Sequence, residues 1–193
     1  GVSCPIGLCS WIMSDYGRIG DYIGPVAAKK LSAVDIDANS SNQHEFGGND
    51  ALRRLLGTGE DRRASQGHGI PTALMYLSDD DAPAVADLET TWYDARRNNP
   101  NRSAEWRLYY KDCEPIRMAR PGDLMCFGML RDNRLLIIIA QHDSTAEAQA
   151  KWLFGIDDEQ EGAFRFHDNT ERELDAFGAQ IFEALGNQRR SAG

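Results

Sequence analysis

Short runs of apolar residues, many of them alternating with polar ones, dominate the chain and are typical of β-strands. Clusters of Gly, Pro, Asn and Asp separate the runs and indicate turns. The pattern predicts strands at residues 25–32, 70–77, 84–93, 105–111, 123–130, 134–141 and 163–167. Arg131-Asp132-Asn133 is short enough to join the fifth and sixth of these as a tight hairpin.

Helix signals occur at four places. Residues 8–16 have helical spacing, and residues 50–56 are preceded by an Asn49 cap and followed by Gly57. Ser144 to Glu147 forms a capping box that opens a helix to about residue 154, and residues 170–173 cap a final helix. The apolar face of that last helix comprises Leu174, Phe177, Ile181, Phe182 and Leu185. Because strands and helices do not alternate as βαβ units, we expect an α+β fold with a mainly antiparallel sheet or partly open barrel.

Two polar stretches interrupt this pattern. Residues 35–48 are rich in short hydrogen-bonding side chains, and residues 96–103 contain three arginines and three asparagines but no apolar residue except Pro100. The second stretch lies between aromatic strands, which predicts a long hairpin that presents guanidiniums and amides. Such side chains suit phosphates and base edges, although a simply solvated hairpin loop is an equally weighted alternative.

The second polar stretch lies in a segment with a positive charge balance. Residues 92–111 contain five basic and two acidic side chains, a balance of +3, whereas the whole chain carries a net charge of −9. Binding of an anion depends on local potential rather than on the total. With 193 residues and 41% hydrophobic content, the chain can form one ample domain or two small ones. Its four cysteines show no metal-binding spacing and favour a reducing, cytoplasmic location.

Several chemistries lack their sequence signatures. No P-loop, dinucleotide-binding glycine motif or histidine metal motif is present. Many restriction-type nucleases place an acidic residue two positions before a lysine to hold Mg²⁺ and water. Here Lys29, Lys30, Lys111 and Lys151 are preceded at that spacing by Ala27, Ala28, Tyr109 and Gln149. We therefore expect no catalytic residue, metal ion or cofactor in this chain, while a hydrolase site assembled only in space stays open as a third alternative.

The order of these motifs resembles a known family. Lys29-Lys30-Leu31-Ser32-Ala33, an amide-rich loop and a short helix are followed by Trp92-Tyr93 and a basic loop with Arg102, Glu105 and Arg107. Together they resemble the N-terminal effector domain of EcoRII-like Type IIE restriction endonucleases over about residues 8–156. The resemblance implies a B3-like DNA-binding pseudobarrel whose two arms read 5′-CCWGG in double-stranded DNA from the major groove.

The resemblance also implies a domain organisation and a partner. Residues 1–156 would be the DNA-binding domain, and residues 157–193 an acidic linker and helix that lead toward a separate C-terminal nuclease domain. That nuclease domain would use Mg²⁺ and be activated allosterically when the effector domain binds DNA, within a bacterial cytoplasmic restriction-modification system without a membrane partner.

The expected arms are residues 29–46 and 96–107. Arginine can bind guanine, glutamate can accept from cytosine N4, and asparagine or glutamine can pair with adenine. In this resemblance Trp106 stands where the family has a lysine. The candidate DNA-binding residues are Lys29, Lys30, Asn39, Ser40, Asn42, Gln43, His44, Arg96, Arg97, Asn98, Asn99, Asn101, Arg102, Ser103, Glu105, Trp106 and Arg107.

Each candidate also has a purely structural interpretation. Glu105 could pair with Arg107 across one strand face, and His44 could serve loop hydrogen bonding. The rival function is a protein-interaction domain in which acidic residues 79–81 and 157–161 contact a basic partner.

Overall fold

The computed structural model describes residues 16–36, 44–157 and 162–191, with side chains in the last helix described up to residue 186. The strands are β1 Ile23–Lys30, β2 Glu45–Gly47, β3 Ile70–Leu77, β4 Ala84–Asp94, β5 Trp106–Tyr109, β6 Leu124–Leu130, β7 Leu135–Ala140 and β8 Arg165–His167. The helices are α1 Ala33–Ile36, α2 Asp50–Leu56, α3 Glu114–Met118, α4 Thr145–Phe154 and α5 Ala176–Ser191, with 3₁₀ turns η2 Ile19–Asp21 and η3 Ala64–Gln66.

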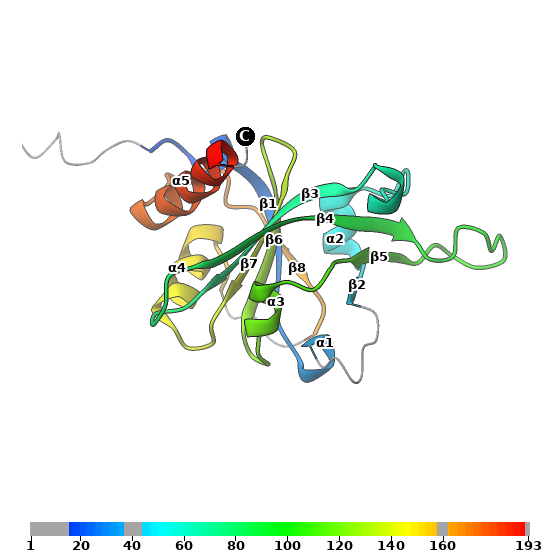
Figure 1. The fold of residues 1–193 in the computed structure, drawn as a ribbon, viewed down its shortest axis with the longest axis horizontal. Helices are drawn as coiled ribbons and strands as arrows, with labels where there is room; N and C mark the ends of the chain where they lie inside the picture. The colour runs from blue at the N-terminus through cyan, green and yellow to red at the C-terminus, as the bar shows by residue number, and fades with distance from the viewer. Residues whose placement is uncertain (1–15, 37–43, 158–161, 192–193) are drawn as a thin grey trace, which may run out of the picture.

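All eight strands belong to one curled sheet in the order β2-β5-β4-β3-β7-β6-β1-β8. Every neighbouring pair is antiparallel except β3 and β7, which are parallel. The expectation of an α+β fold with a mainly antiparallel sheet is therefore confirmed. Figure 1 shows the sheet curving through the middle of the molecule, with α4 and α5 together on one side.

The curl brings the two edge strands of the sheet toward each other. The ring of Phe46 in β2 lies with its centroid 6.0 Å from that of Phe164, which directly precedes β8. Helix α2 lies beside this gap: the Nδ2 of its cap residue Asn49 donates to the Phe164 carbonyl, and the Arg54 guanidinium stacks 3.6 Å from the Phe166 ring. Edge strands with unpaired backbone invite aggregation, and the contacts of Asn49 and Arg54 place α2 against the β8 edge.

Side chains from the two faces of the sheet form two separate cores. On β6, Met125 and Phe127 point into the core inside the curl, whereas Leu124 and Cys126 point into the core beneath α4 and α5. Every residue of β7 is buried, because each face of that strand is covered. This explains why residues 135–140 read as one continuous apolar run instead of an alternating pattern.

Two predicted helix caps are present. The Asn49 Oδ1 accepts from the Leu52 amide at 3.2 Å, and the Ser144 Oγ accepts from the Glu147 amide at 3.0 Å. The second half of the predicted capping box does not form, because the Glu147 carboxylate pairs with Lys30 instead.

The last helix begins later than predicted. Helix α5 starts at Ala176, where the Asp175 Oδ1 accepts from the Gly178 amide at 2.8 Å. Thr170 does not cap it and donates its hydroxyl to Asp168. The predicted helix at 8–16 falls almost wholly outside the described residues.

Residues beyond the expected domain boundary, between residues 156 and 157, contribute to the two cores of the sheet. Strand β8 pairs with β1, Phe164 lies inside the curl, and Ile181 and Leu185 of α5 pack in the core beside α4. The described residues 162–186 thus extend the fold of the preceding chain. Within the described part of the chain, no helix is both long and apolar enough to cross a membrane.

Candidate nucleic-acid interface

Strands β4 and β5 continue into a hairpin that projects away from the rest of the molecule (Figure 1). The loop between them, residues 95–105, includes the polar stretch singled out in the sequence. It folds as a succession of turns, in which the Asn99 amide donates to the Arg96 carbonyl and the Arg102 amide to the Asn99 carbonyl. The hairpin expected from the sequence is therefore present.

Asp94 closes the base of this loop. Its Oδ1 accepts from the backbone amides of Arg96 and Glu105, each at 2.9 Å, and the Ala95 amide donates to the Glu105 carbonyl at 2.8 Å. One carboxylate thus binds both sides of the hairpin, which fixes the direction in which the loop leaves the sheet.

Asp61, from a segment far away in sequence, braces the same base from outside. It accepts from the Asp94 amide at 3.0 Å and from the Arg97 Nε at 2.9 Å, and it pairs with Arg63 at 3.1 Å. Burial alone would raise the pKa of the Asp61 carboxyl, but these hydrogen bonds lower it below its usual value. The Arg63 guanidinium also stacks 4.8 Å from the Tyr93 ring.

Glu105 and Glu45 neutralise the remaining arginines of the hairpin base. Glu105 pairs with Arg96 at 2.6 Å and with Arg107 at 2.8 Å, and Glu45 pairs with Arg107 at 3.2 Å. The hydrogen bond from Arg107 is the main reason that the pKa of Glu105 is lowered. The ion pair between Glu105 and Arg107, which was the structural interpretation of Glu105, is therefore present.

These pairs change the charge picture drawn from the sequence. Asp61 and Glu45 come from other segments, and both lie against arginines that a count over residues 92–111 treats as unopposed. Arg102 differs, since it is exposed and makes no ion pair within the described part of the chain. Of the basic residues in that count, Arg102 in the loop and Lys111 beyond β5 are the two without an ion pair within the described part of the chain.

The tip carries the candidate residues that stay open to a partner. Asn98, Asn99, Asn101, Arg102 and Ser103 are all exposed. Arg96 and Arg97 lie lower, in the ion pairs described above. A ligand approaching the hairpin end-on would therefore meet three amides, one hydroxyl and one guanidinium.

The described end of the first arm, residues 44–46, lies directly beside the hairpin. Its last strand, β2, pairs with β5, so Phe46 faces Leu108 and Gly47 faces Arg107 in the register. The Glu45 carboxylate accepts from Arg107 and from the Tyr93 hydroxyl, which connects the arm to both hairpin strands. The described end of the first arm is in this way joined to the strand that leads out of the second polar stretch.

His44 opens the described part of this junction. Its carbonyl accepts from the Tyr110 amide at 3.1 Å, and its ring makes an edge contact with the Tyr110 ring at 5.6 Å. Burial is the main cause that raises the pKa of Tyr110 to about 12. The remaining first-arm candidates Asn39, Ser40, Asn42 and Gln43 lie outside the described residues.

Lys29 and Lys30 differ from expectation. Their residues are only 8% and 9% exposed, and each ammonium is engaged in an ion pair, Lys29 with Asp35 at 2.8 Å and Lys30 with Glu147 at 2.7 Å. Because both faces of β1 are covered, both side chains turn into packed surroundings instead of solvent. As they lie in this structure, neither presents its charge to a phosphate.

Trp106 also departs from its place among the candidates. Alternation along β5 turns Arg107 and Tyr109 outward and Trp106 and Leu108 inward, so Trp106 is only 4% exposed. Its ring stacks on Trp92 at a centroid distance of 5.3 Å, close above Gly48, where any Cβ would come within 2.4 Å of Trp92. Trp106 is a core residue that supports the hairpin from beneath.

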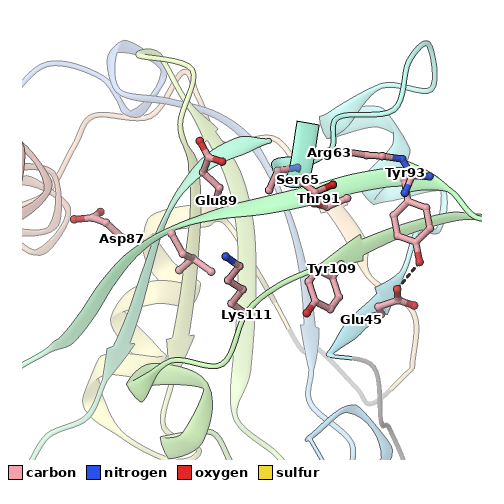
Figure 2. Close-up of a pocket in the computed structure, with 11 residues that line it drawn as sticks. Glu45, Arg63, Ser65, Asp87, Glu89, Thr91, Tyr93, Tyr109 and Lys111 are labelled. Atoms are coloured by element: carbon pink, nitrogen blue, oxygen red, sulfur yellow. Dashed lines mark hydrogen bonds between the residues drawn. The ribbon is translucent and has the colours of Figure 1, made fainter. Parts of the chain in front are cut away.

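A groove of about 640 Å³ lies on the outward face of β4 and β5 (Figure 2). The Tyr93 hydroxyl points to Glu45 at one end, and Arg63 and Ser65 lie across β4 from Lys111 and Tyr109. Groups of both signs line it, so it has no uniform preference for an anion. The residues that form its walls are Glu45, Arg63, Ala64, Ser65, Asp87, Leu88, Glu89, Thr91, Tyr93, Tyr109 and Lys111.

Sequence reasoning missed Glu45, Asp61 and Tyr93 as members of this site. Glu45 belongs to a three-residue strand, and Asp61 to a loop that carries no motif. Only the strand alternation of Tyr93 with Trp92 gave a signal, since it places the tyrosine on the face opposite the buried tryptophan.

One cluster among the described residues has ligand types that suit a metal ion, namely His142, Asp143 and Glu147. The Lys30 ammonium lies 2.7 Å from the Glu147 carboxylate and 3.3 Å from the His142 Nδ1. A positive charge thus already occupies the position between two of the three ligands, which disfavours a cation there.

Comparisons with models of known protein families and with curated proteins gave no match to this chain.

Proposed function

We propose that this chain binds double-stranded DNA sequence-specifically, with residues 29–46 and 96–107 as two arms. The observation that supports the proposal is the pairing of β2 with β5, which joins the described end of the first arm to the strand that leaves the second arm, with Glu45 and Arg107 as an ion pair between them. Two adjacent polar loops on a rigid sheet are suited to contact bases and backbone in one groove.

The chemistry of the hairpin tip supports specific recognition. A guanidinium binds the guanine O6 and N7, and asparagine amides pair with the adenine N6 and N7. Arg102 and the neighbouring asparagines present these groups on a loop whose base is fixed by Asp94 and Asp61. Because a preorganised loop loses less conformational entropy on binding, the bracing of its base favours affinity.

Electrostatics favour base reading over non-specific attraction. A protein that binds DNA only through its charge presents many unopposed cations. Here Arg96, Arg97 and Arg107 are paired with carboxylates, and the net charge of the chain is −9. We therefore expect weak binding to unrelated DNA and a specificity that depends on few residues.

The remaining expectations belong to the same proposal. The chain acts as a B3-like pseudobarrel and as the effector domain of an EcoRII-like Type IIE restriction endonuclease, with 5′-CCWGG as its site. Its partner is a C-terminal nuclease domain of the same parent protein, which uses Mg²⁺ and is activated when the effector domain binds DNA in the bacterial cytoplasm. The curled sheet and the pairing of β2 with β5 support this assignment.

Fluorescence anisotropy tests the proposal with three duplexes of equal length. One contains CCAGG, one contains the same bases in scrambled order, and one contains an unrelated palindrome. We expect the first to bind at least about 10³-fold more tightly than the others at physiological salt. Equal affinity for all three would contradict specific recognition, and specific binding of the palindrome alone would contradict the proposed site.

The rival function, contact with a basic partner protein, has one observation in its favour. Asp80, Asp81, Asp87 and Glu89 are exposed near the start of β4. Asp79 is less available, because its carboxylate accepts from the Thr145 and Ala146 amides at the start of α4. This rival would be favoured if binding to a basic protein were lost in the double variant Asp87→Asn with Glu89→Gln and kept in Arg102→Ala.

A further inference from the structure

We propose that Lys29 is a positioning residue for the first arm, which holds both described ends of the arm on the sheet without contacting DNA. The inference rests on the proposed function for the role of the arm, although the anchoring itself is independent of any ligand. It assigns to Lys29 a task opposite in kind to the phosphate contact expected from the sequence.

The first end of the arm is held through Asp35 of α1. The Lys29 Nζ lies 2.8 Å from the Asp35 Oδ1, and the Asp35 Oδ2 accepts from the Ser32 amide at 2.8 Å and its hydroxyl at 2.9 Å. Helix α1 has only four residues, too few for a stable isolated helix. Its position therefore depends on the carboxylate that Lys29 and Ser32 contact, together with Ile36, which packs against the core inside the curl.

The second end is held through Phe46 of β2. The Lys29 Nζ lies 5.9 Å from the centroid of the Phe46 ring and 5.0 Å from that of Phe164. A buried ammonium at these distances is attracted by the ring faces. One side chain thus contacts the start of the arm, the end of the arm and the segment before β8.

Burial makes this contact sensitive to substitution. The Lys29 and Asp35 side chains are 10% and 17% exposed, so the Lys29 ammonium depends on Asp35 for an opposing charge, and Asp35 on Lys29 together with the hydrogen bonds from Ser32. When one partner of such a pair is removed, the remaining charge is left in an apolar environment and the local structure must move to reach water. The segment with the fewest other constraints is α1, and we expect it to move first.

Lys30 provides a matched control in the next position of the same strand. Its pair with Glu147 is similarly short, at 2.7 Å, and its side chains are 11% and 8% exposed, while Lys151 pairs with the same carboxylate at 3.5 Å. Glu147 belongs to α4, which lies on the other side of the sheet from the arm (Figure 1). Loss of this second pair removes a buried ammonium from the same strand, as loss of the first does, but it should not release the arm.

Hydrogen exchange of the full chain tests the anchoring without DNA. In Lys29→Met and Asp35→Asn, peptides covering residues 32–36 and 44–47 should exchange at least about tenfold faster than in the wild-type protein. In Lys30→Met these peptides should exchange as in the wild type, while peptides of α4 become faster. If Lys29→Met fails to fold, the isosteric Asp35→Asn decides. Equal exchange of the arm peptides in Asp35→Asn and Lys30→Met would overturn the inference.

The sign of a charge effect on DNA affinity tests the positioning role. If Lys29 contacted phosphate, Asp35→Asn would remove a competing negative charge, and binding to the CCAGG duplex would stay equal or become tighter. If Lys29 positions the arm, Asp35→Asn should weaken that binding by about tenfold, as Lys29→Met does, with Lys30→Met unchanged. Tighter binding by Asp35→Asn would overturn the positioning role.

The two readouts separate this inference from the proposed function. Failure of the wild-type protein to bind any duplex would remove the DNA-binding proposal, while the exchange of the arm peptides would still decide whether Lys29 anchors them. Conversely, specific binding with unchanged arm exchange in Asp35→Asn would preserve the proposed function and reject the anchoring.

Discussion

The two arms are held in place by different kinds of interaction. The first arm is anchored at Asp35 and beside Phe46 by one buried ammonium, Lys29, in addition to the pairing of β2 with β5, and the ion pair of Lys29 with Asp35 is almost closed to water. The second arm depends on a network at its base, in which the Arg97 and Arg107 side chains are 44% and 32% exposed. A buried pair fixes one geometry and fails abruptly, whereas a half-exposed network shares its contribution among several weak contacts.

The two arms also differ in whether the same residues stabilise the arm and contact a ligand. The second arm holds its paired arginines at the base and presents Arg102 at the tip, so its stability and its contacts to a ligand reside in different residues. The described parts of the first arm, 29–36 and 44–46, consist mainly of its anchors. Substitutions should therefore separate folding from binding in the second arm more easily than in the first.

The largest effect on stability should follow from removing the first-arm anchor, Lys29, and it is compared with the removal of Arg97 at the base of the second arm. Lys29→Met is expected to lower the free energy of unfolding by about 3 kcal/mol, because it leaves the mostly buried Asp35 carboxylate without an opposing charge and with only its hydrogen bonds from Ser32. Arg97→Met removes a pair with Asp61 that water already screens, and should cost no more than about 1 kcal/mol. Urea denaturation of both variants measures the contrast.

The double variant Lys29→Met with Asp35→Asn is the control for this experiment. Since it removes both charges, it should recover part of the stability that Lys29→Met loses. Equal losses for Lys29→Met and Arg97→Met would show that the two arms are held by interactions of similar strength.

The next effect concerns the separation of tip and base in the second arm. Arg102→Ala should weaken binding to the CCAGG duplex by about 1–3 kcal/mol, with little change on scrambled DNA. Its unfolding free energy should change by less than about 0.5 kcal/mol, since Arg102 is exposed and outside the ion-pair network. Anisotropy and urea denaturation of the same preparation measure both quantities.

Arg117→Ala serves as the matched control for Arg102→Ala. Arg117 is also exposed, but it lies on α3 and pairs with Asp112. It should leave both quantities unchanged. An equal loss of affinity on cognate and scrambled duplexes in Arg102→Ala would make that arginine a phosphate contact.

The sequence allowed the framework to be predicted wherever the signal was local. The caps at Asn49 and Ser144 use side chains that bond amides three residues on, and both are found where expected. The turn at residues 131–134 and the long strands of the sheet were likewise visible as short-range patterns. By contrast, β2 has three residues and exists only because β5 is there to pair with it.

The site was less predictable, because its charges are compensated across long sequence distances. Lys29 and Lys30 are adjacent and chemically identical, yet they pair with residues 6 and 117 positions away. No pattern around a lysine shows whether a carboxylate from another segment will bury it. The same limit explains the overestimated charge of the hairpin, since Asp61 lies 36 residues from Arg97.

A smaller effect should appear on acidification of the second-arm base. The pKa of Asp61 is lowered in the folded chain from an ordinary value of 3.8. A carboxyl with a depressed folded pKa contributes stability above its unfolded pKa, and this contribution is lost as pH falls through the folded pKa. The melting temperature of the wild type should therefore exceed that of Asp61→Asn between pH 5 and 7, by a margin that shrinks below about pH 4.

Asp80→Asn is the control for the pH series. Asp80 is exposed and has no ion-pair partner among the described residues, so its substitution should give no pH-dependent difference. A margin for Asp61→Asn that persists unchanged to pH 2 would show that the loss arises from packing and not from the charged state of Asp61.

The smallest expected effect is an absence of change in the salt dependence of binding. A cation that contacts phosphate adds about 0.9 to the slope of log K against log salt, so Arg102→Ala should make the slope shallower by at most that amount. Lys30→Met should leave the slope unaltered, because Lys30 is only 9% exposed and its ammonium pairs with Glu147. Both slopes are measured on the CCAGG duplex between 50 and 300 mM salt, roughly the range over which counterion release dominates. A decrease of about one in the slope of Lys30→Met would mean that Lys30 leaves Glu147 to bind the DNA backbone. In that case Lys30 would exchange its ion pair with Glu147 for a phosphate contact when DNA binds. The contrast between a buried first-arm anchor and a half-exposed second-arm network would then apply only to the unbound protein.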